Sequence, residues 1–287
     1  MRIGIHVSIA GGMKKAAARA VSLGCETMQI FSRSPRGGAA RPLTEHDVQD
    51  MHRILQEADI RPLVVHAPYF LNAAAKEKAT WRAAVEIISQ ELQRAATLQA
   101  AYLVIHCGHN EDAEQGLVRT QTAVMEAFTV ADVSGVALLL ENAAGMGNEI
   151  GFRFRELGAL CHSLRKESLP VGLCLDSCHA FVADYDFTVP EGWQNMLNEV
   201  EEYCGWETVK LIHVNDAVGK AGSRFDRHAA LGKGEIGGKG FKNLFSHPVL
   251  GQLPAVLETP RKSEQDDQEN LEFLRRLRQE IRKGRHH

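Results

Sequence analysis

Leu63-Val-Val-His66 and Leu103-Val-Ile-His106 are two short apolar runs, 40 residues apart, and each ends in a histidine that can bind a metal. Four further runs end in the same kind of side chain: Leu138-Leu-Leu-Glu141, Leu173-Cys-Leu-Asp176, Leu211-Ile-His213 and Val256-Leu-Glu258. The intervals between successive run ends are 40, 35, 35, 37 and 45 residues. Such intervals are typical of one strand followed by one crossover helix.

Two earlier runs, Ile3-Gly-Ile-His6 and Met28-Gln-Ile-Phe31, extend the series to eight strands. Eight strand and helix units predict an α/β fold, a closed (β/α)8 TIM barrel, which we expect to form a single domain over residues 1–283. In such a barrel the C-terminal ends of all strands meet at one face. The His, Glu and Asp side chains that end the strands are therefore expected to converge on one metal site.

Amphipathic segments separate the expected strands and have apolar residues at three- and four-residue spacing. They predict helices over residues 13–23, 45–58, 78–98, 117–130, 154–164, 193–203 and 266–283. Several loops after strands are rich in Gly, Arg and His, and function is expected in residues 32–38, 67–72, 142–147 and 215–240. Residues 284–287 are expected to be a disordered end or a tag remnant.

The composition, with 44% apolar residues in 287, allows one large core, and the longest apolar stretches are far shorter than the roughly 20 residues that span a bilayer. We therefore expect a soluble, cytoplasmic protein. The six cysteines form no C-x-x-C pair and are expected to be reduced thiols. Cys174 and Cys178 flank Asp176, but core packing is favoured over zinc binding for both.

The net charge of −3 argues at first against a nucleic-acid partner. Bound metal would change this balance, because three Zn²⁺ ions would bring the net charge from −3 to +3. Many acidic residues also lie on expected outer helices, for example residues 199–202. The loop face of the barrel can therefore still attract a polyanion.

Nine residues are candidate metal ligands: His66, His106, Glu141, Asp176, His179, His213, Asp226, His228 and Glu258. One metal cannot use nine ligands. A set of imidazoles and carboxylates without thiolate is typical of catalytic zinc, manganese or iron, and the number of imidazoles favours zinc.

Two spacings indicate further metal sites beside the first. Asp176-x-x-His179 would carry His179 outward if a helix begins after the strand. Asp226-Arg-His228 places two ligands on one side of an extended loop. A bridging carboxylate between metals about 3.5–4 Å apart is then expected, as in two-metal phosphoryl transfer. The remaining histidines of helices and connections are interpreted as surface residues: His46, His52, His162 and His247.

The residues that carry this pattern resemble those of endonuclease IV, the zinc-dependent apurinic/apyrimidinic endonucleases of base excision repair. The resemblance runs the whole chain. Its motifs are His6-Val-Ser with Gly11-Gly12, His66-Ala-Pro-Tyr69, Glu141-Asn-Ala-Ala-Gly145, Leu175-Asp-Ser-Cys-His179-Ala-Phe, His213-Val-Asn-Asp216, Ser223-Arg-Phe-Asp-Arg-His228, Leu231-Gly-Lys-Gly-Glu-Ile-Gly237 and Leu257-Glu-Thr-Pro260. Together these motifs are highly specific.

The resemblance implies three zinc ions per chain. The implied ligand sets are His66, His106 and Glu141 for the first, Glu141, Asp176, His213 and Glu258 for the second, and His179, Asp226 and His228 for the third. Glu141 would bridge the first two ions and position the hydroxide nucleophile. The implied reaction cuts the phosphodiester 5′ to an abasic deoxyribose in duplex DNA, leaving a 3′-hydroxyl and a 5′-deoxyribose phosphate. We expect a monomer.

The resemblance also implies loop residues that open the DNA, namely Arg36 after the second strand and Tyr69 and Phe70 after the third. Inserted side chains can fill the gap that an abasic nucleotide leaves. Packing over the barrel mouth is the alternative for Tyr69 and Phe70, and a solvated loop arginine is the alternative for Arg36. The chain departs from many family members in having Gly37-Gly38, instead of an aromatic residue, after this arginine.

Two other features leave alternatives open. His106-Cys-Gly-His109 has cysteine where the family commonly has proline, so a looser turn is possible there, and no role is assigned to His109. Four glycines lie at positions 232, 234, 237 and 238. They could cradle a phosphate through backbone N–H groups, but no nucleotide-binding pattern flanks them, and a mobile loop is the preferred interpretation.

Two other functions compete with the nuclease. A xylose-isomerase-like sugar isomerase or epimerase would use the inner set Glu141, Asp176, His213 and Glu258, but it would not need the other candidate ligands. A non-catalytic protein that binds damaged DNA would be expected to have lost a ligand, and none of the nine is missing. Both considerations favour the nuclease.

Overall fold

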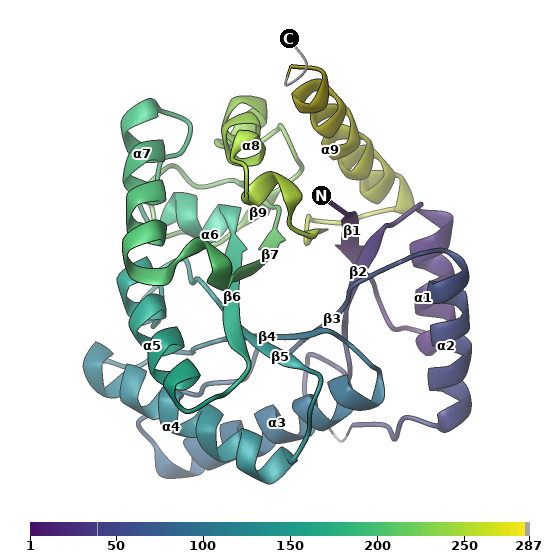
Figure 1. The fold of residues 1–287 in the computed structure, drawn as a ribbon, viewed down its shortest axis with the longest axis vertical. Coiled ribbons are helices and arrows are strands. Elements are labelled where there is room, and N and C mark those ends of the chain that lie inside the picture. The colour runs from purple at the N-terminus through teal and green to yellow at the C-terminus, as the bar shows by residue number, and fades with distance from the viewer. Residues whose placement is uncertain (39, 285–287) are drawn as a thin grey trace.

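Eight parallel strands close a barrel in this computed structural model, which describes residues 1–38 and 40–284 (Figure 1). The strands are β1 (Ile3–His6), β2 (Thr27–Phe31), β3 (Leu63–His66), β4 (Tyr102–His106), β5 (Ala137–Glu141), β6 (Val171–Asp176), β7 (Val209–His213) and β10 (Ala255–Leu257). Each strand pairs with its neighbour in the chain, and β10 closes the ring by pairing with both β7 and β1. The predicted TIM barrel is confirmed.

The helices surround the barrel, as Figure 1 shows. They are α1 (Met13–Ser22), α2 (Glu45–Glu57), α3 (Lys78–Thr97), α4 (Ala113–Ala131), α5 (Phe154–Lys166), α6 (Ser177–Val182), α7 (Pro190–Glu199), α8 (Gly237–Ser246) and α9 (Glu264–Gly284). Each of the seven predicted helices has a counterpart here. Helix α4 begins four residues before its predicted start, because the Asp112 side chain accepts a hydrogen bond from Gln115 N at 3.0 Å and caps the first turn.

Three elements differ from the sequence-based expectation. The helix predicted over residues 193–203 is α7 followed by a π-helical turn, Val200–Cys204. Helix α8 begins inside residues 215–240, which were expected to form a loop. The sequence did not predict this helix because its first residues are glycines, which have low helix propensity. A small hairpin, β8 (Asp216–Ala217) with β9 (His228–Ala229), stands beyond β7.

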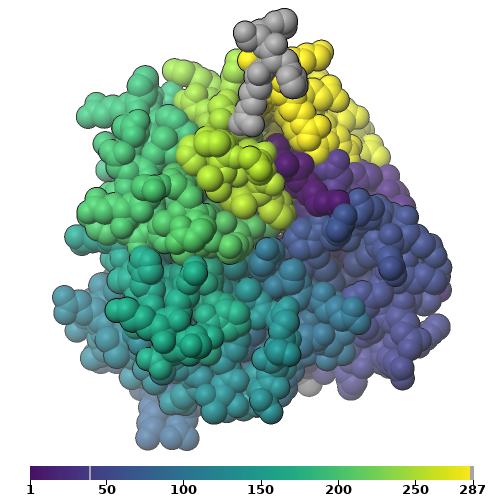
Figure 2. Space-filling view, in the orientation of Figure 1, coloured from purple at the N-terminus to yellow at the C-terminus, as the bar shows by residue number. Residues whose placement is uncertain are grey.

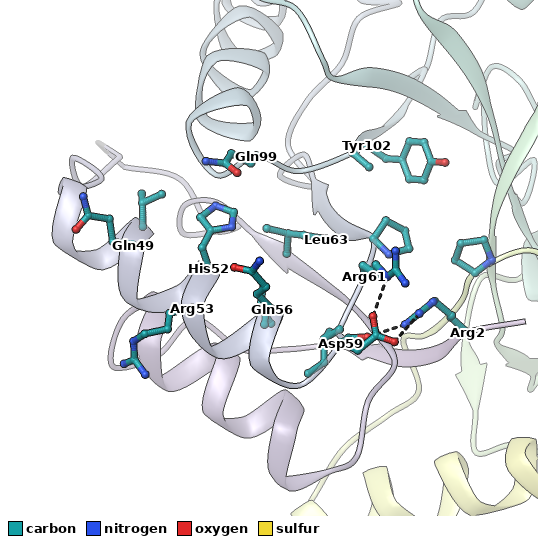
Figure 3. Close-up of a pocket in the computed structure, with 16 residues that line it drawn as sticks. Arg2, Gln49, His52, Arg53, Gln56, Asp59, Arg61, Leu63, Gln99 and Tyr102 are labelled. Atoms are coloured by element: carbon teal, nitrogen blue, oxygen red, sulfur yellow. Dashed lines mark hydrogen bonds and ion pairs between the residues drawn. The ribbon is translucent and has the colours of Figure 1, made fainter.

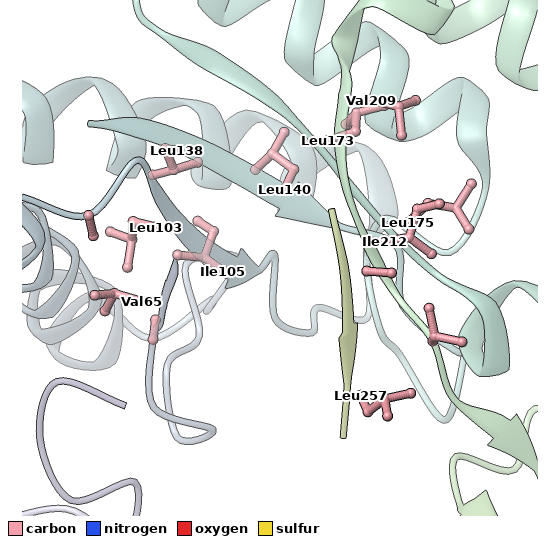
Figure 4. Packing of buried hydrophobic residues seen from close by; sticks show 14 of the residues in the cluster. Val65, Leu103, Ile105, Leu138, Leu140, Leu173, Leu175, Val209, Ile212 and Leu257 are labelled. Atoms are coloured by element: carbon pink, nitrogen blue, oxygen red, sulfur yellow. The ribbon is translucent and has the colours of Figure 1, made fainter. Parts of the chain in front are cut away.

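Side chains of the barrel strands alternate between two buried layers. One layer fills the inside of the barrel and consists of Val64, Val104, Leu139, Cys174, Leu211 and Val256. We call these six residues the inner cluster. Their immediate neighbours in sequence, such as Val65, Leu140 and Leu257, belong to the larger core between barrel and helices (Figure 4). Burying each such Val or Leu stabilises the fold by about 1.5–3 kcal/mol relative to exposure.

The two ends of the chain meet where the barrel closes. Figure 2 shows the purple N-terminal segment against the yellow C-terminal helix. Arg278 of α9 donates to Met1 O at 3.0 Å and pairs with Glu26 at 2.5 Å. A disordered end was expected over residues 284–287. Gly284 instead belongs to helix α9, and residues 285–287 lie outside the described residues.

All six cysteines are free and buried. Within the described part of the chain, no helix is both long enough and apolar enough to span a bilayer.

Candidate metal centre

Six candidate ligands lie at the C-terminal ends of neighbouring strands. We call them the rim: His66 on β3, His106 on β4, Glu141 on β5, Asp176 on β6, His213 on β7 and Glu258 directly after β10. Each follows a member of the inner cluster by two residues, so its side chain also points into the barrel. Strand pairing aligns His106 with Glu141, and Asp176 with His213. The fold therefore brings the strand-end side chains to one place.

Glu141 lies among the rim histidines and is fully buried. Its Oε2 is 3.1 Å from Nε2 of His66 and 3.4 Å from Nε2 of His106. Its Oε1 is 3.0 Å from Nδ1 of His213 and 3.4 Å from Nδ1 of His179. A carboxylate with imidazoles on both of its oxygens has the arrangement of a bridging ligand.

Hydrogen bonds on the far side of two rim imidazoles decide which ring nitrogen carries the proton. Nδ1 of His66 lies 2.6 Å from the carbonyl oxygen of Ala67, so this nitrogen must be the donor. Nε2 of His213 donates to Oε1 of Gln29 at 2.8 Å. The other nitrogen of each neutral ring is an acceptor, and it faces a carboxylate oxygen that is also an acceptor. Such pairs attract only through a proton or a cation between them, which fits a metal site.

His179, Asp226 and His228 form a second cluster, which we call the outer group. Oδ1 of Asp226 is 3.3 Å from Nε2 of His179 and 3.5 Å from Nε2 of His228. Nδ1 of His179 donates to Asn142 O at 2.9 Å, and Nδ1 of His228 donates to Glu258 O at 3.0 Å. Nε2 of His228 is buried and has no hydrogen-bond partner. An unpartnered imidazole nitrogen beside a carboxylate is suited to a cation.

Asp176 lies between the rim and the outer group. Its Oδ1 accepts a hydrogen bond from His179 N at 2.8 Å, which caps helix α6. Its Oδ2 accepts one from Nδ2 of Asn215 at 2.5 Å. Asp176 can join a group with Cys178 and His228, in which the ligand atoms lie within 4.8 Å of one another. Similar groups are His66 with His213 and Glu258, His66 with His106 and Glu141, and the outer group.

Buried amides orient one of these carboxylates, and sequence reasoning missed them. Nε2 of Gln29 donates to Oε1 of Glu258 at 2.6 Å. Nδ2 of Asn215 donates to Oε2 of Glu258 at 3.4 Å, and Oδ1 of Asn215 accepts from the backbone N of Glu258 at 2.9 Å. Gln29 is a polar residue inside an apolar strand run, and that was the available signal.

His6 also reaches the site and was not among the predicted ligands. Its Nδ1 lies 3.4 Å from Oε1 of Glu258, and its ring packs 4.3 Å from the ring of Phe31. Nε2 of His6 is buried without a hydrogen-bond partner. His6 ends the first apolar run, just as each rim residue ends its own run. This position in the sequence was a signal that His6 belongs to the site.

Burial and neighbouring charges oppose each other in the titration of these groups. Burial lowers the pKa of His106 to about 4, so this ring is neutral and offers a lone pair. Burial would raise the pKa of Glu141, but the imidazoles of His213 and His106 hold it well below its usual range. Burial lowers the pKa of His179, whereas Asp176 and hydrogen bonding raise it well above its usual value. Protons and metal ions compete for such a cluster.

The two cysteines that flank Asp176 fit the predicted packing role. Cys174 belongs to the inner cluster, and burial raises the pKa of its thiol to about 12. Burial also raises the pKa of the Cys178 thiol. Protonated thiols are poor metal ligands, although Cys174 lies near Glu141 and His213.

The three predicted DNA-contacting side chains are exposed at the mouth. Tyr69 is 69% exposed, and its ring is 5.1 Å from Phe31 and 6.2 Å from His66. Phe70 is 46% exposed, and a Cβ on Gly37 would lie 3.9 Å from its Cε1. Arg36 is exposed and precedes this glycine. The loop after β2 therefore contacts the loop after β3, close to the rim.

A buried ion pair fastens the loop after β2 to helix α3. Nε of Arg33 lies 2.5 Å from Oε1 of Glu91, and both side chains are buried. Oγ of Ser32 donates to Oε2 of the same carboxylate at 2.6 Å, while Arg94 donates to Ser32 Oγ at 2.7 Å. Removing one partner of a buried pair is strongly destabilising, so this ion pair holds the start of the loop that carries Arg36 against α3.

The glycine-rich segment has a different role from either expectation. The buried carboxylate of Asp216 accepts N–H groups of Gly232, Gly234, Ile236 and Gly237 at 2.8–3.3 Å. Those donors serve a side chain of the chain itself, so they are not a free phosphate cradle, and their hydrogen bonding argues against an open mobile loop. A Cβ on Gly234 would lie 2.5 Å from Asp216 Oδ1, so only glycine allows this approach.

The histidines outside the site differ in exposure. His46 and His162 are exposed, as predicted. His247 is partly buried, with its ring 4.2 Å from that of Trp206. His52 is partly buried as well, and its Nε2 has no hydrogen-bond partner. These two are less exposed than His46 and His162, since His52 lines a groove and His247 packs on Trp206.

The side chain of His109 is exposed, while its backbone is held on both sides by Asn72. Nδ2 of Asn72 donates to His109 O at 3.2 Å, and Oδ1 accepts from His109 N at 3.0 Å. Cys107 is buried, and its carbonyl accepts from Ala74 N at 3.0 Å. The turn after β4 is therefore tightly bonded although it has no proline.

A groove of about 1270 Å³ lies at the opposite end of the barrel, between α2 and the starts of β3 and β4 (Figure 3). It is lined by residues such as His52, Gln56, Arg61 and Tyr102. Asp59 pairs with both Arg2 and Arg61 there, at 2.7 and 2.8 Å. None of the nine candidate ligands lines this groove, so the groove and the metal centre are separate sites.

Known proteins resemble this chain over nearly its full length. Residues 17–277 match the family described as xylose isomerase-like TIM barrel. A protein named probable endonuclease 4 from Methanosphaerula palustris is 41% identical over 281 residues, covering 96% of this chain and 98% of that protein. The crystal structure of endonuclease IV from Thermus thermophilus superposes with a TM-score of 0.87 at 36% identity, covering 98% of this chain and 100% of that one. A D-tagatose 3-epimerase-like protein has a TM-score of 0.75 at 16% identity and coverage of 99% of both chains, which shows a common fold alone.

Proposed function

The chain belongs to the endonuclease IV family of the xylose isomerase-like TIM barrels and is a nuclease, and we propose that it repairs DNA by cutting at abasic sites. The proposed reaction hydrolyses the phosphodiester bond 5′ to an abasic deoxyribose in duplex DNA. The products would be a 3′-hydroxyl and a 5′-deoxyribose phosphate. The same chain supplies all nine candidate ligands, so we propose that a monomer is active.

One observation carries this proposal, namely that Glu141 faces imidazoles with both carboxylate oxygens. His66 and His106 lie on one oxygen and His213 on the other. A site for one ion would need only one of these faces. The two-sided arrangement supports a pair of metal ions that share a carboxylate.

The donor set fits three zinc ions. We propose the ligand sets His66, His106 and Glu141, then Glu141, Asp176, His213 and Glu258, and finally His179, Asp226 and His228. Imidazole and carboxylate donors are those of catalytic zinc, and the unpartnered Nε2 of His228 supports the third site. When bound, the ions would supply a water-derived nucleophile at neutral pH and would polarise the phosphate oxygens.

The chain's own residues would orient the metal ligands and contact the DNA. Gln29 fixes the tautomer of His213, and the carbonyl of Ala67 fixes that of His66, so the nitrogens that face Glu141 keep their lone pairs. Tyr69 and Phe70 are the exposed aromatic side chains beside the rim. We propose that they enter the gap left by the missing base, because filling it offsets part of the unstacking cost.

The sugar epimerase alternative needs fewer of these residues. Proton transfer on a sugar does not require His106 or the outer group. A phosphodiesterase with three metal ions would use all nine candidate ligands. The likeness to an epimerase-like protein, at 16% identity, concerns the fold alone. A binding protein without activity is also disfavoured, since all nine candidate ligands are present.

The test uses purified, chelator-free protein and a duplex with one tetrahydrofuran abasic analogue. We expect a single incision 5′ to the analogue, with a 3′-hydroxyl that a polymerase can extend. The intact duplex of the same sequence should not be cut. Elemental analysis of the same preparation should find about three metals per chain, mostly zinc. Full activity with one metal per chain would refute the three-metal site, and absence of incision would refute the proposed function.

A further inference from the structure

Two guanidinium groups lie over the ring of Phe152, in the segment between β5 and α5. Cζ of Arg224 is 4.9 Å and Cζ of Arg153 is 5.1 Å from the ring centroid. Arg153 also lies 5.7 Å from the ring of Tyr185, and its Nη1 donates to Ala183 O at 3.2 Å. Cation–π attraction therefore holds two positive charges against one ring.

Within residues 1–38 and 40–284, neither guanidinium of this pair has a carboxylate within the ion-pairing distance of 4.0 Å. Arg33 and Arg278, by contrast, each pair with a glutamate at 2.5 Å. Two positive charges on one ring without a directly paired carboxylate favour an anion that bonds both guanidiniums.

The pair lies beside the metal centre. A Cβ on Gly145 would be 3.0 Å from the Phe152 ring, so this ring packs on the loop that directly follows Glu141. Arg224 precedes Asp226 of the outer group by two residues, and its backbone N donates to Val182 O of α6 at 2.9 Å. Both guanidiniums are thus attached to segments that also carry metal-centre residues.

The barrel order puts Arg224 across the mouth from Tyr69 and Phe70, while Arg153 follows β5, two positions from β3. Strands β3 and β7 are four positions apart in a ring of eight, which makes them opposite. Tyr69 and Phe70 follow β3, whereas the hairpin with Arg224 follows β7. A duplex that lies across the mouth would therefore meet the aromatic side chains and Arg224 on opposite sides of the metal centre.

We propose that Arg153 and Arg224, held on Phe152, form a binding site for one backbone phosphate of the DNA. The planar guanidinium presents a fork of N–H donors that matches two phosphate oxygens. The inference rests on the proposed function for the identity of the polyanion. The site would position the duplex without reading its sequence.

The experiment measures binding of the metal-loaded protein to an intact duplex, which is not cleaved, at four or more salt concentrations. Each lost phosphate contact lowers the slope of log K against log salt by about 0.9. Arg224→Ala should bind more weakly and show a slope shallower by about that amount. Arg224→Lys keeps the charge, so its slope should stay near that of the wild type.

Arg282→Ala is the control, because this exposed arginine lies beside Met1 at the other end of the barrel. Its affinity and slope should equal those of the wild type. Metal content is measured for every variant. If Arg224→Ala loses metal, the slope is measured in Arg153→Gln instead, and the same change is expected. Arg153 lies farther along the chain from the candidate ligands, so its replacement should not disturb the metal.

Wild-type slopes in both Arg224→Ala and Arg153→Gln would overturn the phosphate site. A slope in Arg224→Lys as shallow as in Arg224→Ala would overturn it too, since the effect would not follow charge. Failure of the proposed function is a separate result, namely a wild-type protein that does not incise the abasic duplex. The binding slopes remain interpretable in that case.

Discussion

The rim and the β8–β9 hairpin both bring candidate ligands to the centre, but they hold them differently. The rim side chains stand on the packed inner cluster, and three of them, Glu141, Asp176 and His213, are fully buried. The hairpin strands have only two residues each, and the Asp226 side chain is 34% exposed. Most strand-end ligands are thus fixed by packing, although His106 is 30% exposed, whereas the hairpin ligands stand on a short two-stranded element. We therefore expect the two regions to differ in how firmly they retain metal.

The largest effect is expected from the rim. Glu141→Gln removes the negative charge that both faces of the rim share, so cleavage of the abasic duplex should fall by several orders of magnitude while binding is largely kept. Single-turnover incision and fluorescence binding would measure the two quantities. Glu191→Gln, on the exposed side of α7, is the control. Near-normal turnover in a metal-loaded Glu141→Gln protein would reject the bridging assignment.

The hairpin should lose its ion selectively. Asp226→Asn weakens one ligand that is not shared with the rim, so we expect about one metal per chain to be lost and two to remain. Elemental analysis after dialysis would show this. The same order should appear in the wild type under limiting chelator, with the outer ion leaving first because two of its three ligands lie on the short hairpin. If all metal left in one step, the hairpin and the rim would not differ in how firmly they retain metal.

A smaller effect should follow from changes behind the rim. Gln29→Met keeps the volume but removes the acceptor for His213 Nε2, so metal affinity should fall by about 10–100-fold. Competition with a chromophoric chelator would measure it. Gln49→Met, in the groove at the other end of the barrel, is the matched control. Equal affinity in both variants would mean that rim geometry does not depend on this amide.

The smallest effects should come from the exposed mouth. Tyr69→Ala and Phe70→Ala should lower the preference for abasic over intact duplex by up to about 1–3 kcal/mol, with metal content unchanged. Arg36→Ala would instead weaken both duplexes alike if this side chain contacts phosphate. Binding at two salt concentrations separates these cases. An unchanged abasic-to-intact ratio in all three variants would show that recognition comes from DNA bending or from other loops.

Periodicity explains why the rim could be predicted from the sequence. Each rim residue ends an apolar run, and alternation along a strand decides which side it faces. Asp226 and His228 could be found because two residues in an extended segment point the same way. The hydrogen-bond partners of Gln29 and Asn215 could not be predicted, since they are fixed only when distant strands meet, although the polar Gln29 in an apolar run was itself a signal.

Local propensity explains the remaining errors. The start of α8 contains glycines, which disfavour a helix, and its stability depends on the distant Asp216 carboxylate. The buried Arg33–Glu91 pair joins segments 58 residues apart, which no sequence spacing indicates. The π-helical turn after α7 likewise leaves no mark in an apolar pattern of helical period.

Asp216 has a consequence for how this part of the protein opens. Its carboxylate accepts the N–H groups of Ala217, Gly232, Gly234, Ile236 and Gly237, so one side chain joins the hairpin, the glycine-rich segment and the start of α8. These amides should exchange with deuterium together, in a single opening event, instead of fraying one by one. An asparagine would present an NH₂ group to donors that need an acceptor. The hairpin that carries Asp226 and His228 is thus ordered before any substrate arrives. Substrate binding therefore does not have to offset the conformational entropy that would be lost on ordering it.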